Sequence, residues 1–280
     1  MGKEGESGTG PDNFRAIKNT NFAPPIFTEL PGWPAILRVG EMADAGFLEG
    51  LESKAFDGYL VGVGAGTLLS LVKGFGKLKP KGILVVDVNP KVVAFTKVLS
   101  DALVAAQDTD EFVNGFFQQS EQAYEKKIKR ALMANHNPQF QHQASLMSSM
   151  EQFHDSPAEI WGELKYVLRG DMIPVPAIIV DEFETLQGLA RNNNIVSTYG
   201  DISDPDLVDV VRRLPGYETS TNVIYVSSAP SYSGKGQENF WKEVFRFGNP
   251  QSTTYIEAVS RGFELYLEEV NPVFLAASTE

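Results

Sequence analysis

The 280-residue chain is 42% hydrophobic and carries a formal net charge of −12, from 36 acidic and 24 basic residues. It is long enough for one large α/β domain or for a domain with a substantial insertion, and its acidity disfavours a nucleic-acid partner. The chain has no cysteine, which excludes disulfides, thiolate zinc sites and cysteine nucleophiles, and no apolar run approaches the ~20 residues of a membrane helix.

The first 34 residues are predicted to form a tail and an arm outside the central fold. Residues 1–11 are rich in Gly and Glu and have no apolar core, so we expect a disordered tail rather than a signal peptide, with the cytoplasm as the default location. Residues 12–34 combine several prolines with aromatic residues, which favours an extended arm packed over the domain. Phe27 or Trp33 is a candidate to close over a bound ligand.

The centre of the sequence is the stretch 56–90, which predicts a strand, a glycine turn, a helix and a second strand. A helix over 36–51 is expected to precede it, from its apolar residues at helical spacing. After the first strand, Gly62, Gly64 and Gly66 allow a tight turn and let a ligand approach the backbone. The second strand ends on Asp87, and an acid at the carboxyl end of such a strand can hold ribose hydroxyls.

A strong helix is predicted over 91–106, and a mainly helical insertion then occupies 107–191, too long for an ordinary loop. Within the insertion, helices are expected over 111–133, 156–168 and 181–191, with an apolar, proline-marked segment at 172–180. The three histidines all fall within the polar segment 134–155 of the insertion, and their spacing does not indicate a metal site. They are His136, His142 and His154.

The alternation of strands and helices resumes at residue 194. A strand over 195–198 leads to Gly200, Asp201 and Ile202, and a strand over 222–226 leads to the polar segment 227–232. Helices are expected over 206–214 and 237–247. The last strands are expected at 253–258, 263–270 and 273–276, the final two forming an antiparallel pair around an Asn-Pro turn.

The glycine pattern G-x-G-x-G, the later Asp-Val-Asn-Pro and the Gly-Asp-Ile after the third strand resemble class I S-adenosylmethionine-dependent methyltransferases. The resemblance implies an α/β fold with a doubly wound, mostly parallel sheet, an antiparallel carboxyl-terminal edge and a large helical insertion. It covers 56–106 and 194–280, and it implies a Rossmann-like domain built from 35–106 and 192–280, with 107–191 covering the acceptor site. One departure is Leu60, which stands where the family often has an acid.

The resemblance also implies a cofactor, S-adenosylmethionine, and the residues around it. The glycine turn would pass under its methionine part, Asp87 would hold the ribose, and Asp201 would accept the adenine amino group, although Asp201 could instead cap a turn. The implied cofactor-binding residues are Gly62, Val63, Gly64, Ala65, Gly66, Asp87, Val88, Asn89, Gly200, Asp201, Ile202, Ser227 and Ser228. A dinucleotide cofactor is disfavoured, because Thr67 takes the place of the third glycine of that fingerprint.

The favoured function is therefore a methyltransferase acting on a small-molecule acceptor, without a metal and without a membrane span. Tyr124, His154 and Tyr232 are the candidate catalytic residues, and a homodimer is left open. The first alternative is aminocarboxypropyl transfer from the same cofactor, because the Asp-Val-Asn-Pro motif and the helical insertion also resemble enzymes of betaine-lipid synthesis. The second is a non-catalytic binding protein on a methyltransferase fold, motivated by Leu60 and by the plain Ser-Ser-Ala-Pro segment.

Overall fold

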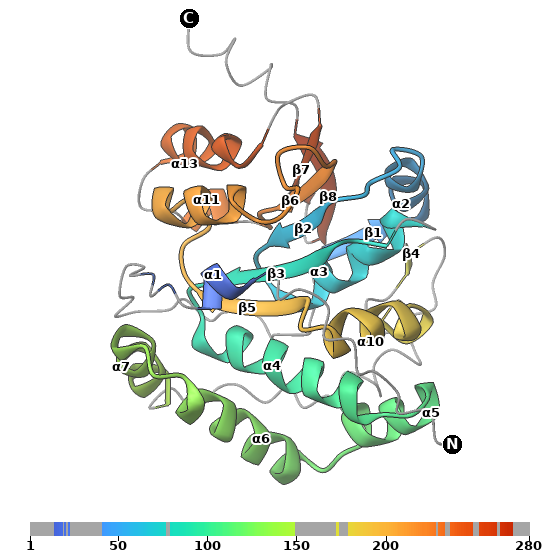
Figure 1. Ribbon diagram of the computed structural model, residues 1–280, viewed down its shortest axis with the longest axis vertical. Helices are drawn as coiled ribbons and strands as arrows, with labels where there is room; N and C mark the ends of the chain where they lie inside the picture. The colour runs from blue at the N-terminus through green and yellow to red at the C-terminus, as the bar shows by residue number, and fades with distance from the viewer. Residues whose placement is uncertain are drawn as a thin grey trace, which may run out of the picture.

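The computed structural model describes residues 14–18, 20, 22, 41–76, 79–148, 172–173, 179–227, 229–232, 236–248, 252–261 and 264–270. Over these ranges the chain is an α/β protein whose mostly parallel sheet lies between two layers of helices (Figure 1). The predicted α/β class, with a mostly parallel sheet and an antiparallel edge, is confirmed. No described helix is both long enough and apolar enough to cross a membrane.

Five parallel strands form the body of the sheet. In spatial order they are β5 (Ile195–Tyr199), β3 (Gly82–Asp87), β2 (Tyr59–Gly62), β6 (Asn222–Tyr225) and β7 (Thr253–Arg261). At the β7 edge, β8 (Glu264–Val270) runs antiparallel to β7, and β1 (Glu41–Asp44) and β4 (Met172–Ile173) complete an eight-stranded sheet. Every residue of β2, β3 and β6 is buried, as expected for parallel strands covered on both faces.

Two apolar clusters, one on each face, hold the helices to the sheet. One face is covered by α2 (Ala45–Glu52), α3 (Ala65–Ser70) with the 3-10 turn η1 (Leu71–Phe75), α4 (Pro90–Ala105) and α10 (Phe183–Arg191). The other is covered by α1 (Arg15–Lys18), α11 (Pro205–Arg212), α13 (Gln237–Val244) and the 3-10 turn η3 (Phe245–Phe247). Figure 1 shows α11 and α13 on the opposite side of the sheet from α4 and α10.

The insertion packs on the outer side of α4. Its described helices are α5 (Thr109–Phe112), the π-helix η2 (Val113–Phe117), α6 (Glu121–Ala134) and α7 (Pro138–Ser148). Phe116 of η2 lies against Phe95 of α4, with ring centroids 5.8 Å apart. Both α6 and α7 also contact α4 (Figure 1). The described helices of the insertion thus share the core of the sheet.

Several sequence predictions needed correction. The helix expected over 36–51 is wrong for 41–44, because this short segment pairs with β8 and β4 as strand β1, and the helix begins at Ala45. The single helix expected over 111–133 is interrupted, because Ser120 accepts a hydrogen bond from the Ala123 amide (3.3 Å) and starts a new helix. The arm segment expected to be extended contains the helical turn α1.

The antiparallel pair observed at the carboxyl-terminal edge is formed by β7 and β8. Strand β8 pairs with β7, from Arg261 opposite Glu264 to Tyr255 opposite Val270. The predicted partner at 273–276 and the Asn-Pro turn lie outside the described residues, as does the helix expected over 156–168. The predicted strands β2, β3, β5 and β6 and the helices α4, α10, α11 and α13 are confirmed, with ends that differ by a few residues.

One buried side chain, Asn222, ties together the amino ends of the central strands. Its Oδ1 accepts a hydrogen bond from the Tyr59 amide (2.9 Å), and its Nδ2 donates to the carbonyls of Tyr217 (2.9 Å) and Ser220 (3.1 Å). Gly58 is required beside it, because a Cβ there would lie 2.3 Å from the Asn222 Oδ1. Asn222 therefore joins β6 both to β2 and to the loop that precedes β6.

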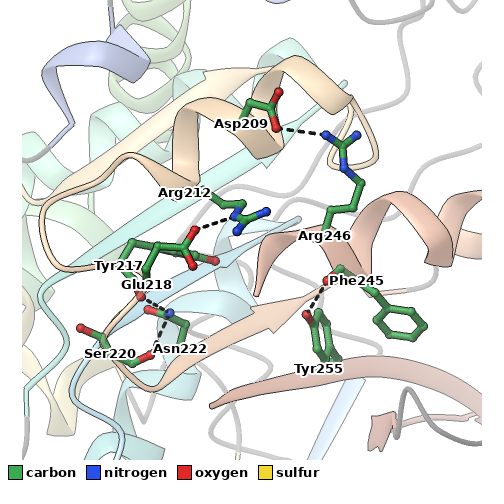
Figure 2. A network of polar contacts seen from close by, with 9 residues as sticks. All are labelled: Asp209, Arg212, Tyr217, Glu218, Ser220, Asn222, Phe245, Arg246 and Tyr255. Atoms are coloured by element: carbon green, nitrogen blue, oxygen red, sulfur yellow. Dashed lines mark hydrogen bonds and ion pairs between the residues drawn. The ribbon is translucent and has the colours of Figure 1, made fainter. Parts of the chain in front are cut away.

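Figure 2 shows the polar contacts that surround Asn222. Arg246 forms an ion pair with Asp209 of α11 (3.0 Å), and Arg212 forms one with Glu218 (2.7 Å). The Tyr255 hydroxyl donates to the Phe245 carbonyl (3.1 Å), which joins β7 to η3. The two ion pairs are partly exposed and contribute little stability, whereas the hydrogen bonds of the buried asparagine are costly to lose.

We predict that Asn222→Asp lowers the free energy of unfolding by about 3 kcal/mol. The substitution replaces an amide that donates to two buried carbonyls with a carboxylate that repels them. Urea denaturation measures the effect, with the exposed Asn114→Asp as control, expected to change stability by less than about 0.5 kcal/mol. An equal effect of the two substitutions would contradict the role given to Asn222.

Candidate functional site

The candidate site lies where β2, β3, β5 and β6 end, at the carboxyl edge of the sheet. From β2 the chain moves outward to β3 and β5, and then returns to place β6 on the other side of β2. Helices after β2 and β3 lie on one face, whereas those after β5 and β6 lie on the other. Such a reversal of direction between neighbouring strands opens a crevice for ligands in α/β sheets.

The glycines of the turn after β2 have separate roles. A Cβ on Gly62 would lie 2.2 Å from the Tyr225 carbonyl oxygen, so Gly62 permits the close packing of β2 against β6. Gly64 has a φ of +70°, a conformation that favours glycine, and a Cβ there would meet no atom of the described residues within 4 Å. Gly66 is buried within α3, after Ala65, the first residue of that helix. Open space beside the backbone is therefore found at Gly64.

Asp87 is the buried acid of the site. It is 9% exposed, its Oδ2 accepts a hydrogen bond from the Gly64 amide (3.1 Å), and its Oδ1 accepts one from the Asn89 amide (2.8 Å). Burial raises the pKa of Asp87 to about 6, against the opposing effect of these two hydrogen bonds. Since the folded pKa exceeds the unfolded one, ionising Asp87 costs the folded state stability, and this cost grows between about pH 4 and pH 6.

Beyond Asp87, the motif residues have clear local roles. The Asn89 side chain is 1% exposed, and its Oδ1 accepts a hydrogen bond from the Lys91 amide (2.9 Å), so it caps the start of α4. Pro90 occupies the first turn of that helix, where its missing N–H is no loss. Val88, between Asp87 and Asn89, is half-buried. The cofactor roles of Val88 and Asn89 stay predictions.

The turn after β5 is joined to Asp87 through the backbone. The Gly200 amide donates to the Asp87 carbonyl (3.1 Å). Asp201 Oδ1 accepts hydrogen bonds from the amide (2.8 Å) and hydroxyl (2.7 Å) of Ser203, so this carboxylate shapes a local turn. Ile202 is 2% exposed and belongs to the apolar core. The alternative turn role of Asp201 is thus observed, and its adenine role stays a prediction.

Backbone strain marks the end of β6. Ser227 has a φ of +53°, an uncommon conformation for a residue other than glycine, and its carbonyl accepts a hydrogen bond from the Ala258 amide (3.1 Å). Strain of this kind costs about 1 kcal/mol or more and is often found at functional sites. Ser228 lies outside the described residues, and the structure places the Tyr232 backbone in the short helix α12 (Ala229–Tyr232).

The predicted catalytic residues are not brought together with Asp87 by any described contact. Tyr124 lies on the first turn of α6, 9% exposed, within the apolar cluster that contains Phe116 and Phe117. His154 lies outside the described residues. Among the described residues, no group of three or more His, Asp or Glu side chains is arranged to hold a metal ion. The catalytic assignments stay predictions.

Sequence reasoning missed three residues at this edge: Phe22, Asn137 and Tyr199. Tyr199 is paired with Asp87 in the sheet register, and its buried ring contacts Phe140 of α7 edge to face, with centroids 5.4 Å apart. Asn137 could have been found, because Asn followed by Pro138 is a helix-start pattern. For Phe22, the sequence offered only its place in an aromatic arm.

Comparison with known families places most of this architecture in one family. Residues 53–264 match the model of a family described as "Domain of unknown function (DUF7790)". The chain belongs to this family. The part that matches runs from the end of α2 to the first residue of β8, so the DUF7790 region includes the glycine turn, Asp87 and the insertion, whereas α1 and β1 precede it. No curated protein matches the chain.

We predict that Gly64→Ala lowers the free energy of unfolding by only about 1–2 kcal/mol, the strain of a side chain at positive φ. Gly216→Ala is the matched control at the amino edge: Gly216 also has a φ of +70°, and the nearest atom to a new Cβ there would be the end of a flexible side chain, the Lys81 Nζ, at 3.3 Å. Urea denaturation should give similar losses for both variants. A much larger loss for Gly64→Ala would show that the space beside the turn is filled.

Proposed function

We propose that this DUF7790 protein is an S-adenosylmethionine-dependent methyltransferase that acts on a small-molecule acceptor. The observation that carries the proposal is the Asp87 carboxylate, which is buried at the carboxyl end of β3 and bonded to the Gly64 amide of the turn after β2. A nucleoside in this crevice would meet an acid and an open glycine backbone together. The strand order and the antiparallel β8 support a methyltransferase-like version of the doubly wound fold.

The residues present fit this cofactor. The open space at Gly64 would accommodate the cofactor where it passes the backbone, and Asp87 could accept hydrogen bonds from both ribose hydroxyls. When bound, S-adenosylmethionine supplies an electrophilic carbon beside its sulfonium. The protein then has to bind the acceptor in line and exclude water, which requires neither a metal nor a covalent intermediate.

The net charge of the protein bears on the chemical class of the acceptor. A net charge of −12 disfavours a polyphosphate acceptor, so a small molecule is the better candidate. The insertion supplies α7, whose Phe140 packs against Tyr199 at the carboxyl edge, so the insertion reaches the strand ends where an acceptor would bind. This contact supports an acceptor-site role for the insertion through α7 rather than through Tyr124.

Aminocarboxypropyl transfer is the second candidate, favoured by the helical insertion that follows α4. The Asp-Val-Asn-Pro motif supports this candidate less strongly, because Asn89 and Pro90 already have a structural role at the start of α4. The product distinguishes the two: a methyltransferase releases S-adenosylhomocysteine, and an aminocarboxypropyl transferase releases methylthioadenosine. A non-catalytic binding protein would release neither, and Leu60, fully buried where the family often has an acid, is consistent with such a departure.

Calorimetry with S-adenosylhomocysteine tests the cofactor site. We predict that Asp87→Ala weakens binding by about tenfold to a hundredfold, because a charged hydrogen-bond acceptor contributes about 1.5–3 kcal/mol. Asp57→Ala is the matched control, since the exposed Asp57 also accepts a backbone hydrogen bond, from Thr221 (2.9 Å), but lies at the amino edge. Equal affinity of wild type and a folded Asp87→Ala variant would remove the basis of the proposal.

The affinity should also depend on pH. The ligand needs the ionised Asp87 to accept hydrogen bonds from its hydroxyls, and with a pKa of about 6 this carboxyl is mostly protonated at pH 5. We therefore predict that S-adenosylhomocysteine binds about tenfold more weakly at pH 5 than at pH 7. Asp87→Ala should show little dependence on pH over this range. A wild-type affinity that is flat from pH 5 to pH 7 would contradict a direct contact with Asp87.

A further inference from the structure

The amino-terminal arm reaches the proposed cofactor site through Phe22. Phe22 is 3% exposed, and its Cβ lies 3.5 Å from the position that a Cβ on Gly200 would occupy, beside Val86 at 3.6 Å. Further back along the arm, the Phe14 ring covers the opposite end of β3, where it fills the space left by Gly82. The arm therefore covers the amino end of β3 through Phe14, and Phe22 packs on the turn after β5.

The insertion side chain Asn137 binds the backbone of Phe22, which is also packed in an apolar cluster. Its Nδ2 donates a hydrogen bond to the Phe22 carbonyl (3.2 Å). Its Oδ1 accepts hydrogen bonds from the amides of Gln139 (2.9 Å) and Phe140 (3.3 Å), so the same side chain caps the start of α7. Asn137 thus joins two segments that are more than a hundred residues apart in the chain.

Both of these segments pack against residues that are joined to Asp87 by the sheet register or by a backbone hydrogen bond. Phe140 of α7 packs on Tyr199, which is paired with Asp87 in the sheet. Phe22 packs on Gly200, whose amide donates to the Asp87 carbonyl (3.1 Å). A change in the position of either the arm or α7 would therefore shift the carboxyl ends of β3 and β5.

We propose that Asn137 is a positioning residue that couples docking of the arm at Phe22 to ligand binding at Asp87 and the Gly200 turn. The identity of the ligand rests on the function proposed above. If the docked arm favours the geometry that binds the ligand, then the ligand must stabilise the docked arm by the same factor. Arm docking and nucleoside binding are thus two readouts of one equilibrium.

Two substitutions isolate the donor of Asn137. Asn137→Asp and Asn137→Ser both keep an oxygen that can cap α7, and both lose the amide that reaches the Phe22 carbonyl. Asn192→Asp is the matched control, because it also removes a side-chain donor to a backbone carbonyl, that of Gly188 (2.8 Å), at the exposed end of α10. The neutral serine separates loss of the donor from the added charge of aspartate.

The experiment combines calorimetry with hydrogen–deuterium exchange of a peptide covering residues 14–22, with and without S-adenosylhomocysteine. We expect both Asn137 variants to bind the ligand about three- to tenfold more weakly than the wild type. In the wild type, the ligand should slow exchange of the arm peptide, and in both variants this effect should be lost. Thermal unfolding of the variants should stay close to wild type, because the cap is kept.

Two results would overturn the coupling: wild-type affinity in both Asn137 variants, or arm exchange in the wild type that the ligand does not change. If the wild type binds no S-adenosylhomocysteine, the proposed function fails and the coupling to this ligand fails with it. Hydrogen exchange of the arm peptide without ligand then still tests whether Asn137 holds Phe22. Faster exchange in both Asn137 variants than in Asn192→Asp supports that contact, and equal exchange rejects it.

Discussion

The hydrogen bond from the Gly64 amide to Asp87 is the constraint on which the candidate site depends (3.1 Å). It joins the turn after β2 to the end of β3, and both partners are fixed from elsewhere. Gly62 fixes the turn, because only a residue without a Cβ can lie so close to the Tyr225 carbonyl. Asn89 fixes the other side, because it caps α4 with its side chain and donates its amide to Asp87. The result is a carboxylate held in a buried position where its ionisation is costly.

The two edges of the sheet differ in how their polar groups are used. At the amino edge, Asn222 makes three hydrogen bonds to protein groups and Gly58 leaves room for it, an arrangement that serves stability. At the carboxyl edge lies a buried acid with a raised pKa, Asp87, whereas positive φ at residues other than glycine occurs at both edges, at Ser227 on this side and at Ala55 and Asn193 on the other. Proteins retain a buried acid of this kind mainly where function requires it. The contrast supports a ligand site at the carboxyl edge, independently of any family resemblance.

Much of the central fold could be predicted from the sequence, because local signals and tertiary structure agree there. The apolar runs of β2 and β3, the glycine turn between them and the Asn-Pro start of α4 each specify their element locally. Strand β1 could not be predicted in this way. Its four residues lie inside the helical pattern over 36–51, and pairing with β8 and β4 decides their conformation.

The candidate site was only partly predictable for a similar reason. Asp87 follows from its place at the end of a buried strand, but its hydrogen bond to Gly64 and its raised pKa depend on packing. The separate roles of Gly62 and Gly64 appear only when the surroundings of each glycine are known. Phe22 and Asn137 meet across a long stretch of chain, and no local pattern indicates such a contact.

The central claim is that the Asp87 carboxylate binds the ligand, and carbon-13 NMR of the aspartate carboxyl groups tests it most directly. The Asp87 resonance can be assigned by its loss in Asp87→Asn, and in the free protein it should titrate with a pKa of about 6. Ribose hydroxyls that donate to the carboxylate would favour its ionised form, so saturating S-adenosylhomocysteine should lower this pKa by about one unit or more. A ligand that binds but leaves the Asp87 titration unchanged would contradict the claim.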